Sequence, residues 1–180
     1  MFAVRCADRA SIQWWTVTIR SLAHTGVCVP DVEEAVAWYR DVIGMKVLSP
    51  PYLMSGPAIE RDMGELVPGL SLRAAIVGFE RSDHVLELLE YPGNRAGDPH
   101  RVLSDLGISH IGLVCDDLAA TRSDLEQRGV RFLTTGIAGI AGLRTTWFED
   151  PYGTVFILME KEDAERPYWR QTLPVGRSRD

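Results

Sequence analysis

Two histidines and one glutamate are the residues of this 180-residue chain whose types and spacing point to chemistry. His24 and His110 lie 86 positions apart (110 − 24), and each opens a short β-prone run. Glu87 stands in HVLELLE between apolar neighbours, where a carboxylate is costly to bury unless a cation compensates it. Imidazole and carboxylate groups are ligands of divalent first-row metals, and such a set leaves coordination positions open for substrate or water. We therefore predict that His24, Glu87 and His110 bind a metal ion.

The two histidines belong to an internal repeat. The segment AHTGVCVPDV (23–32) is matched by SHIGLVCDDL (109–118), and the same offset aligns Asp31 with Asp117. A lone histidine in a strand is usually hydrogen-bonded in a core, but two at equivalent positions of a repeat are harder to explain by packing. Two long units indicate pseudo-symmetric halves rather than a solenoid, which needs three or more repeats.

Each half is predicted to have the order β-α-β-β-β. In the first half we expect strands at 22–29, 45–49, 71–79 and 84–91, a helix that begins after Asp31 and ends at Gly44, and a long loop at 50–69. In the second half we expect strands at 108–115, 130–135, 143–149 and 154–161, and a helix that begins after Asp117 and ends at Gly129.

Strand periodicity predicts which way the histidines point, because successive side chains lie on opposite faces of a sheet. In the first strand Val27 and Val29 form the more apolar face, which should pack beneath the helix. His24 and Gly26 then lie on the opposite, inner face, where the glycine leaves room beside the histidine. The second half repeats this pattern around His110.

The last strands of the two halves align at an offset of 70 (154 − 84), which matches Glu90 with Glu160 but Glu87 with Ile157. Isoleucine offers no lone pair to a metal. Glu160 lies three residues further along the strand and therefore on the opposite face. The repeat thus places a carboxylate at this position in the first half alone.

The composition excludes several classes of partner. A net charge of −6 and a pI of about 5.2 argue against nucleic acid, which normally binds a basic face. No apolar run approaches the roughly 18–20 residues of a membrane span, and the first residues lack a signal-peptide core. Three scattered cysteines indicate neither a disulfide framework nor a zinc knuckle, and we expect Cys28 and Cys115 to be buried. We expect a soluble, cytoplasmic protein that binds a small molecule, and neither nucleic acid nor a membrane.

With these motifs, the chain resembles the vicinal oxygen chelate superfamily, which includes glyoxalase I, methylmalonyl-CoA epimerase, extradiol dioxygenases and bleomycin-resistance proteins. The resemblance rests on the two strand–helix openings, on HVLELLEY and on FEDPYGTVFILME, whose DPYG matches the family's turn before the final strand. It implies an α+β fold in which two βαβββ modules form an open, barrel-like mixed sheet with a concave cleft for metal and ligand.

The internal repeat also indicates how the chain is divided. We expect an N-terminal arm (1–20), a first βαβββ module (21–92), a linker (93–106), a second βαβββ module (107–162) and a polar C-terminal tail (163–180). Superfamily members form the cleft either within one chain or between two paired chains, and the sequence leaves both open. We expect a homodimer.

For function, the resemblance implies a metal-dependent lyase or isomerase that acts on a small molecule with vicinal oxygens through an enolate-type intermediate. The four glyoxalase-type ligand positions fall on His24, Glu87, His110 and Ile157. A divalent ion (Ni, Co, Zn, Mn or Fe) would then have three protein ligands, and Glu87 would double as the catalytic base. Two alternatives stay open: a small-molecule binding protein of the resistance type, and an extradiol-type dioxygenase, whose glutamate belongs at the position of Ile157.

Overall fold

The computed structural model describes residues 21–69, 71–80, 82, 84–91, 103, 107–140 and 142–171. The predicted N-terminal arm and almost all of the predicted linker lie outside these residues. None of the helices in the described part of the chain is long and apolar enough to cross a membrane.

The first group of elements forms a four-stranded sheet in the order β1-β4-β3-β2. Its strands are β1 (His24–Cys28), β2 (Lys46–Met54), β3 (Leu72–Gly78) and β4 (Val85–Glu90). β1 and β4 run parallel, and the other pairs are antiparallel. The helix α1 (Val32–Trp38) continues into a π-helical turn (Tyr39–Ile43) that ends at Gly44, whose φ of 82° favours glycine.

The second group forms a five-stranded sheet in the order β5-β9-β8-β6, with β7 paired to β8. Its strands are β5 (Ile111–Cys115), β6 (Arg131–Phe132), β7 (Ala138–Ile140), β8 (Leu143–Glu149) and β9 (Val155–Lys161). The helix α3 (Leu118–Gln127) follows β5, and a short 3₁₀ helix (Tyr168–Arg170) follows β9. The predicted helix caps are confirmed, because Asp31 and Asp117 each accept a backbone N–H three residues on at 2.9 Å.

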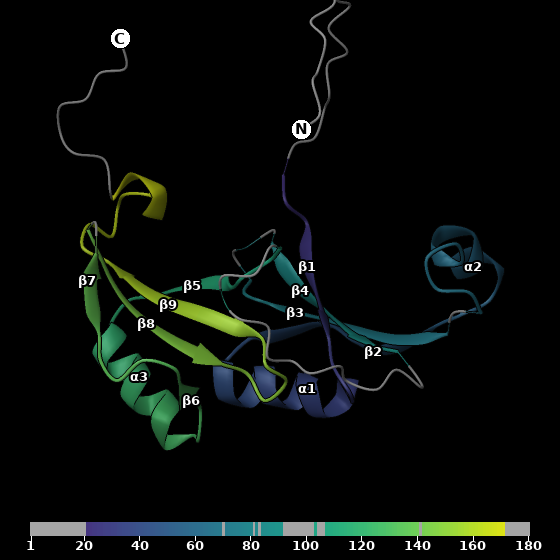
Figure 1. The fold of residues 1–180 in the computed structure, drawn as a ribbon, viewed down its shortest axis with the longest axis horizontal. Coiled ribbons are helices and arrows are strands. Elements are labelled where there is room, and N and C mark those ends of the chain that lie inside the picture. Colours follow the sequence, from purple (N-terminus) through teal and green to yellow (C-terminus); the bar gives the residue numbers. More distant parts are fainter. Residues whose placement is uncertain are drawn as a thin grey trace, which may run out of the picture.

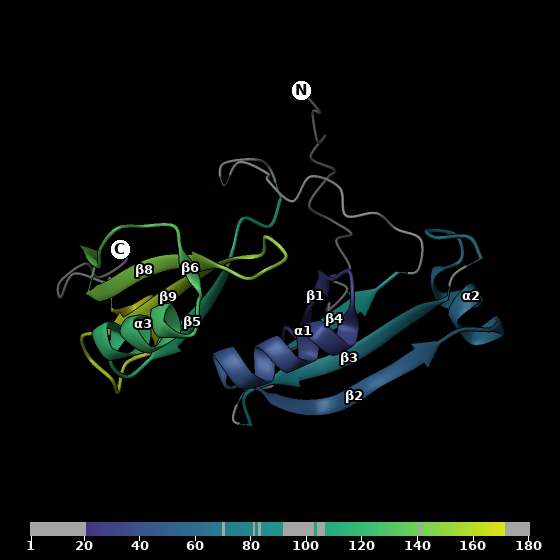
Figure 2. The same cartoon turned by 90° about the horizontal axis from the view of Figure 1, so that it is seen from below.

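The two sheets lie side by side, with α1 and α3 on the same side of them. Figure 1 shows both helices below the sheets, and Figure 2, seen from below, shows them in front. The predicted α+β class is confirmed, and both halves have the βαβββ elements, with α2 added in the first half and β7 in the second. Within the described residues, the sheets stay open, are not joined by strand pairing and close no barrel.

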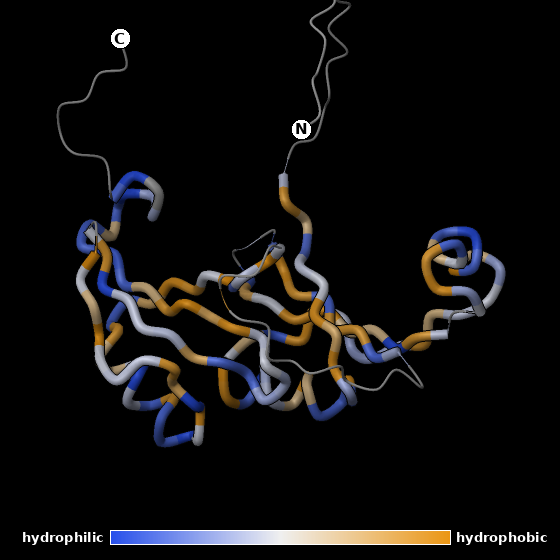
Figure 3. Tube along the Cα trace, in the orientation of Figure 1, coloured by the Kyte–Doolittle hydropathy of each residue, from blue (hydrophilic) through white to orange (hydrophobic). Residues whose placement is uncertain are grey.

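One apolar core joins the two modules. Tyr39, which is fully buried, packs edge-on against Phe156 with ring centroids 6.4 Å apart, and Phe148 stacks on Phe156 at 5.1 Å. The Tyr39 hydroxyl donates a hydrogen bond of 2.6 Å to Oδ2 of Asp150 in the turn between β8 and β9. The π-helical turn of the first module is therefore held against the second sheet. In Figure 3 hydrophobic residues follow the strands of both sheets, whereas α3 is largely hydrophilic.

The predicted strand faces are confirmed. Val27 and Val29 are buried in the core beneath α1, and Ile111 and Leu113 pack against the same core from β5. The alternate positions, which include His24, are exposed. The face of each first strand that carries the histidine thus points away from the helix.

The prediction of a single long loop between the second and third strands is wrong. β2 runs on to Met54, and a further helix, α2 (Pro57–Met63), follows it. A proline in the first turn suits a helix start, because the N–H that it lacks has no helical partner there. Ile59 of α2 packs in a small apolar cluster with Leu72 and Ala74 of β3, whose side chains alternate with those that face α1. α2 therefore covers one end of the face that carries the histidine.

The prediction that Cys28 is buried is also wrong, because its side chain is exposed. Cys28 shares the face of His24, four residues along β1, and so points away from the core. Cys115 lies on the helix-side face of β5 and is half-buried, with its Sγ 3.6 Å from the carbonyl oxygen of Met159.

Candidate functional site

His24 and Glu87 face each other on the exposed side of the first sheet. β1 and β4 are parallel neighbours, and their register sets Gly26 opposite Glu87, so that His24 lies diagonally across from the glutamate. The His24 Nε2 atom is 3.4 Å from Oε2 of Glu87. The two side chains are 53% and 21% exposed, which leaves this pair open to a ligand from solvent. The fold thus brings together two of the three predicted metal ligands.

His110 lies in the second module, one residue before β5. Its ring meets Trp147 of β8 edge-on, with centroids 4.8 Å apart, and its Nδ1 is 2.7 Å from Oγ of Ser109. Across the described part of the chain, the imidazole of His110 does not join His24 and Glu87 in a group whose ligand atoms all lie within 4.8 Å of one another. A single chain therefore unites two of the predicted ligands and holds the third elsewhere.

Ile157 occupies the position in the second module that Glu87 occupies in the first. Gly112 pairs with Ile157 across β5 and β9, as Gly26 pairs with Glu87 across β1 and β4. A methyl-bearing side chain therefore stands where the first module has a carboxylate. A Cβ added at Gly112 would lie 3.0 Å from Cε of Met159, so this glycine leaves room for the methionine rather than for the histidine.

Two aromatic residues next to these groups were not predicted from the sequence. Trp147 is the ring partner of His110, and Tyr91 follows β4 on the same strand face as Glu87. Burial raises the pKa of Tyr91, and the nearby Cys28 and Glu87 raise it further, so the phenol stays protonated and can donate a hydrogen bond. The even spacing between Glu87 and Tyr91 is the sequence signal that could have identified the tyrosine.

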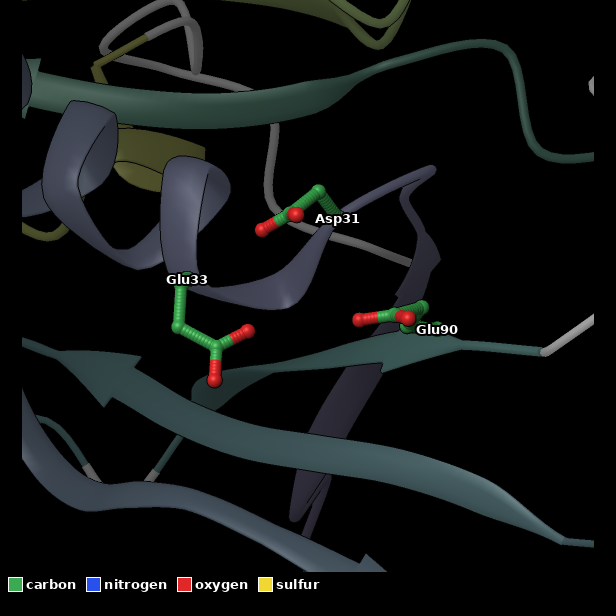
Figure 4. Close-up of side chains that lie close together, drawn as sticks. All are labelled: Asp31, Glu33 and Glu90. Carbon is green, nitrogen blue, oxygen red and sulfur yellow. The ribbon is translucent and has the colours of Figure 1, made fainter.

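A cluster of three acidic side chains lies at the start of α1 (Figure 4). Asp31, Glu33 and Glu90 form the one group of three metal-ligand atoms within 4.8 Å found among the described residues. Oε2 of Glu90, however, accepts the backbone N–H of Val32 at 3.0 Å. Arg73 forms ion pairs with both Glu33 and Glu90. These carboxylates are therefore occupied by a helix N-terminus and a guanidinium.

The second module has the same arrangement at the start of α3, which indicates that the arrangement stabilises the helix N-terminus. Oε2 of Glu160 accepts the backbone N–H of Leu118 at the first turn of α3, at 2.8 Å. Arg144 donates to the same carboxylate, also at 2.8 Å. Carboxylates stabilise helix N-termini by accepting free backbone N–H groups and by opposing the helix dipole. The match of Glu90 with Glu160 thus has a structural role at the start of each helix, and the carboxylates of the cluster around α1 already have partners within the chain.

Residues 21–158 match the sequence profile of the Glyoxalase/Bleomycin resistance protein/Dioxygenase superfamily. The chain belongs to this superfamily. The match covers both modules, and it agrees with the resemblance that the repeated motifs carry.

Named relatives in the superfamily are distant. The chain is 26% identical over 154 residues to methylmalonyl-CoA epimerase of Mus musculus, covering 79% of this chain and 72% of the relative. It is 25% identical over 169 residues to a probable lactoylglutathione lyase of Arabidopsis thaliana, covering 92% of this chain but 43% of the relative, so it spans less than half of that protein. A solved glyoxalase family protein from Bacillus cereus superimposes with a TM-score of 0.71 at 15% identity, covering 82% of this chain and 97% of that one. That likeness shows the fold alone.

Proposed function

We propose that the chain is a metal-dependent lyase or isomerase of the glyoxalase and epimerase type, acting on a small molecule with vicinal oxygens. The observation that carries this proposal is the separation of 3.4 Å between His24 Nε2 and Glu87 Oε2 on an exposed sheet face. Two ligand atoms at about 2.1 Å from one tetrahedral ion are separated by about 3.4 Å. The pair is thus spaced as two donors to one divalent ion would be.

In this proposal the third ligand, His110, comes from a second copy of the chain. His110 is exposed but does not meet His24 and Glu87 within the described residues of one chain. A homodimer in which the second module of one copy faces the first module of the other would bring His110 to the His24–Glu87 pair. Each ion would then be held by two residues of one copy and one of the other.

The residues around the pair favour a reaction with a single base. A bound divalent ion would supply Lewis-acid polarisation of the substrate oxygens. Glu87 removes the proton beside the substrate carbonyl and returns it to a neighbouring atom on the same side. Ile157 provides no second carboxylate for the opposite side, so isomerisation or lyase chemistry suits this site better than epimerisation. Tyr91 keeps its proton and provides a donor for a substrate oxygen.

Ile157 also favours a second function, the binding of a small molecule without turnover. A fourth ligand position filled by an apolar side chain reduces the affinity for a metal but leaves the sheet face able to hold an organic ligand. The superfamily name includes bleomycin resistance proteins, which agrees with this alternative.

Metal titration of the purified protein tests the site. Isothermal titration calorimetry with Ni²⁺, Co²⁺, Zn²⁺, Mn²⁺ and Fe²⁺ should give one ion per chain, with light scattering reporting a dimer in the same sample. Glu87→Gln and His24→Ala should each weaken binding at least tenfold. Glu80→Gln is the matched control, since Glu80 is exposed at 74% and pairs with Lys46 rather than with His24. Full metal affinity in a monomer would refute the shared site.

Proton exchange separates the two functions. A panel of compounds with a hydroxyl group beside a carbonyl is incubated in D₂O with metal-loaded protein, and exchange of the adjacent proton is followed by NMR. An enzyme should accelerate exchange for one member of the panel, and Glu87→Gln should abolish it. Tight binding of a compound without proton exchange, or no affinity for any metal, would refute the enzyme and favour the small-molecule binding function.

A further inference from the structure

The face of the first sheet that carries His24 and Glu87 continues into an apolar cluster. Leu72 and Ala74 of β3 are fully buried there. Partly buried apolar side chains from neighbouring segments pack against them: Met54, Ile59, Met63, Val67, Leu89 and Tyr91. Figure 1 shows α2 at the end of β2, on the side of the first sheet that lies away from the second module. The segment around α2 therefore adds an apolar surface at one end of the face that carries the proposed metal site.

Leu89 and Tyr91 connect this cluster to the pair of His24 and Glu87. Both lie on the strand face of Glu87, two and four residues further along, and the rise of a strand places them about 7 and 13 Å from it. Leu89 is also close to β1, because a Cβ added at Gly26, the residue paired with Glu87, would lie 3.3 Å from Cδ1 of Leu89. A molecule that is held at the pair and extends along β4 toward α2 therefore meets apolar side chains.

The strands of the first sheet place one lysine and no arginine on the face of Glu87. Among the described strand residues this lysine is Lys46, which pairs with Gly78 at the start of β2, whereas α2 follows the end of β2. The Nζ atom of Lys46 is 3.9 Å from Oε1 of Glu80. A negatively charged group near α2 would therefore find no cationic partner on these strands.

The described arginines of β3 and α2 do not supply a cation to the cluster either. Arg73 points to the opposite face of β3, where it forms an ion pair with Glu90. Arg61 is two residues from both Ile59 and Met63, and residues at that spacing on a helix do not share a face. Because burying a charge without a partner is costly, this end of the sheet favours an uncharged group.

We propose that the substrate of the metal site carries an uncharged apolar group, which lies along Leu89 toward Met63 of α2. This inference rests on the proposed function, because it places the reacting oxygens of the substrate at His24 and Glu87. The substrate class is then an α-hydroxy ketone or α-dicarbonyl compound with an alkyl or aryl substituent, rather than one attached to an anionic carrier. Met63 is a specificity-determining residue, since it belongs to the apolar cluster at the end of this path.

Two compounds with the same hydroxy-ketone head test the proposal. They are 1-hydroxyoctan-2-one and 8-hydroxy-7-oxooctanoate, which differ in having a methyl or a carboxylate group at the end of the tail. Each is titrated by calorimetry into the purified full-length chain, with and without Zn²⁺. The methyl compound should bind at least tenfold more tightly than the carboxylate, and at least tenfold more tightly than hydroxyacetone, which lacks the tail.

Met63→Lys should shift the ratio of these two affinities at least tenfold toward the carboxylate, because an ammonium group at the end of the path attracts the charged tail. Leu66→Lys is the matched control. Leu66 is 79% exposed and lies outside the apolar cluster, so the same charge there should change the ratio by less than about twofold. If Met63→Lys does not fold, the comparison of the three compounds in the wild type still decides.

The outcomes separate this inference from the proposed function. Equal affinity for the methyl and carboxylate compounds, an unchanged ratio in Met63→Lys, or no binding of 1-hydroxyoctan-2-one would overturn the inference. Proton exchange of any of the three compounds that Glu87→Gln abolishes would in those cases leave the proposed function in place. A preference for the methyl compound that Met63→Lys reverses, without proton exchange, would support the apolar subsite and count against the enzyme alone.

Discussion

Removing the hydroxyl group of Tyr39 should weaken the packing of the two modules by about 2 kcal/mol. Asp150 is 3% exposed and accepts three hydrogen bonds, from the Tyr39 hydroxyl at 2.6 Å and from the backbone N–H groups of Tyr152 and Thr154 at 2.9 and 2.7 Å. Hydrogen bonds to charged groups contribute about 1.5–3 kcal/mol, and a buried carboxylate oxygen left without its donor bears the desolvation cost. Tyr39→Phe keeps the ring that packs on Phe156, so the change isolates the hydroxyl.

Urea unfolding of the wild type and of Tyr39→Phe measures this effect. With a slope of about 2 kcal/mol per molar urea, the midpoint should fall by about 1 M while the slope stays the same. Tyr52→Phe is the matched control, because Tyr52 is 39% exposed on β2, and its change should stay within about 0.5 kcal/mol. A loss below 0.5 kcal/mol in Tyr39→Phe would refute the claim that this bond holds the modules together.

The same residue gives a pH dependence with a definite sign. Burial, together with the charge of Asp150, raises the pKa of Tyr39 far above its ordinary value, so the folded protein keeps the phenolic proton. The unfolded chain loses that proton near pH 10. The contribution is therefore complete below pH 10 and falls by about 1.4 kcal/mol per pH unit above it. The advantage of the wild type over Tyr39→Phe should shrink accordingly between pH 10 and 11; an unchanged difference would contradict the argument.

Two further substitutions test the helix start and the empty ligand position. Glu160→Gln removes the charge that accepts the N–H of Leu118 and pairs with Arg144, and it should lower the free energy of unfolding by about 1 kcal/mol in a urea titration; no change would show that the carboxylate does not stabilise α3. Ile157→Glu places a carboxylate opposite Gly112 and should raise the affinity for a divalent ion at least tenfold in calorimetry, whereas unchanged affinity would show that this position does not face the ion.

The sequence predicted the architecture well because the two copies of the repeat could be compared with each other position by position. The offsets that align His24 with His110 and Glu87 with Ile157 reappear as strand register, with Gly26 opposite Glu87 and Gly112 opposite Ile157. Alternation along β1 and β5 also predicted which faces meet the helices, because burial of apolar surface is the strongest constraint on a strand.

The sequence did not predict how the two modules pack against each other. It also did not predict that the segment between β2 and β3 forms a helix. α2 lies in a stretch with prolines and glycines, and its few apolar residues become a helix face only because Leu72 and Ala74 offer a surface to pack on. The packing of the two modules includes the contact of Tyr39 with Phe156, which lie 117 positions apart (156 − 39). Periodicity reports local faces, and it carries no information about such distant contacts.

The two modules share the residues that start their helices and differ at the position of Glu87 and Ile157. Each module must start its own helix, and each has a carboxylate and an arginine for that purpose, Glu90 with Arg73 and Glu160 with Arg144. The metal site that we propose, with one wall from each module, would in contrast need its carboxylate only once. In that proposal Glu87 supplies the carboxylate, and Ile157 adds apolar surface to the opposite wall. The proposed site, shared between modules, would account for two helix caps but one carboxylate at the position of Glu87. The change in metal affinity of Ile157→Glu tests whether the position of Ile157 in the second module faces the same site.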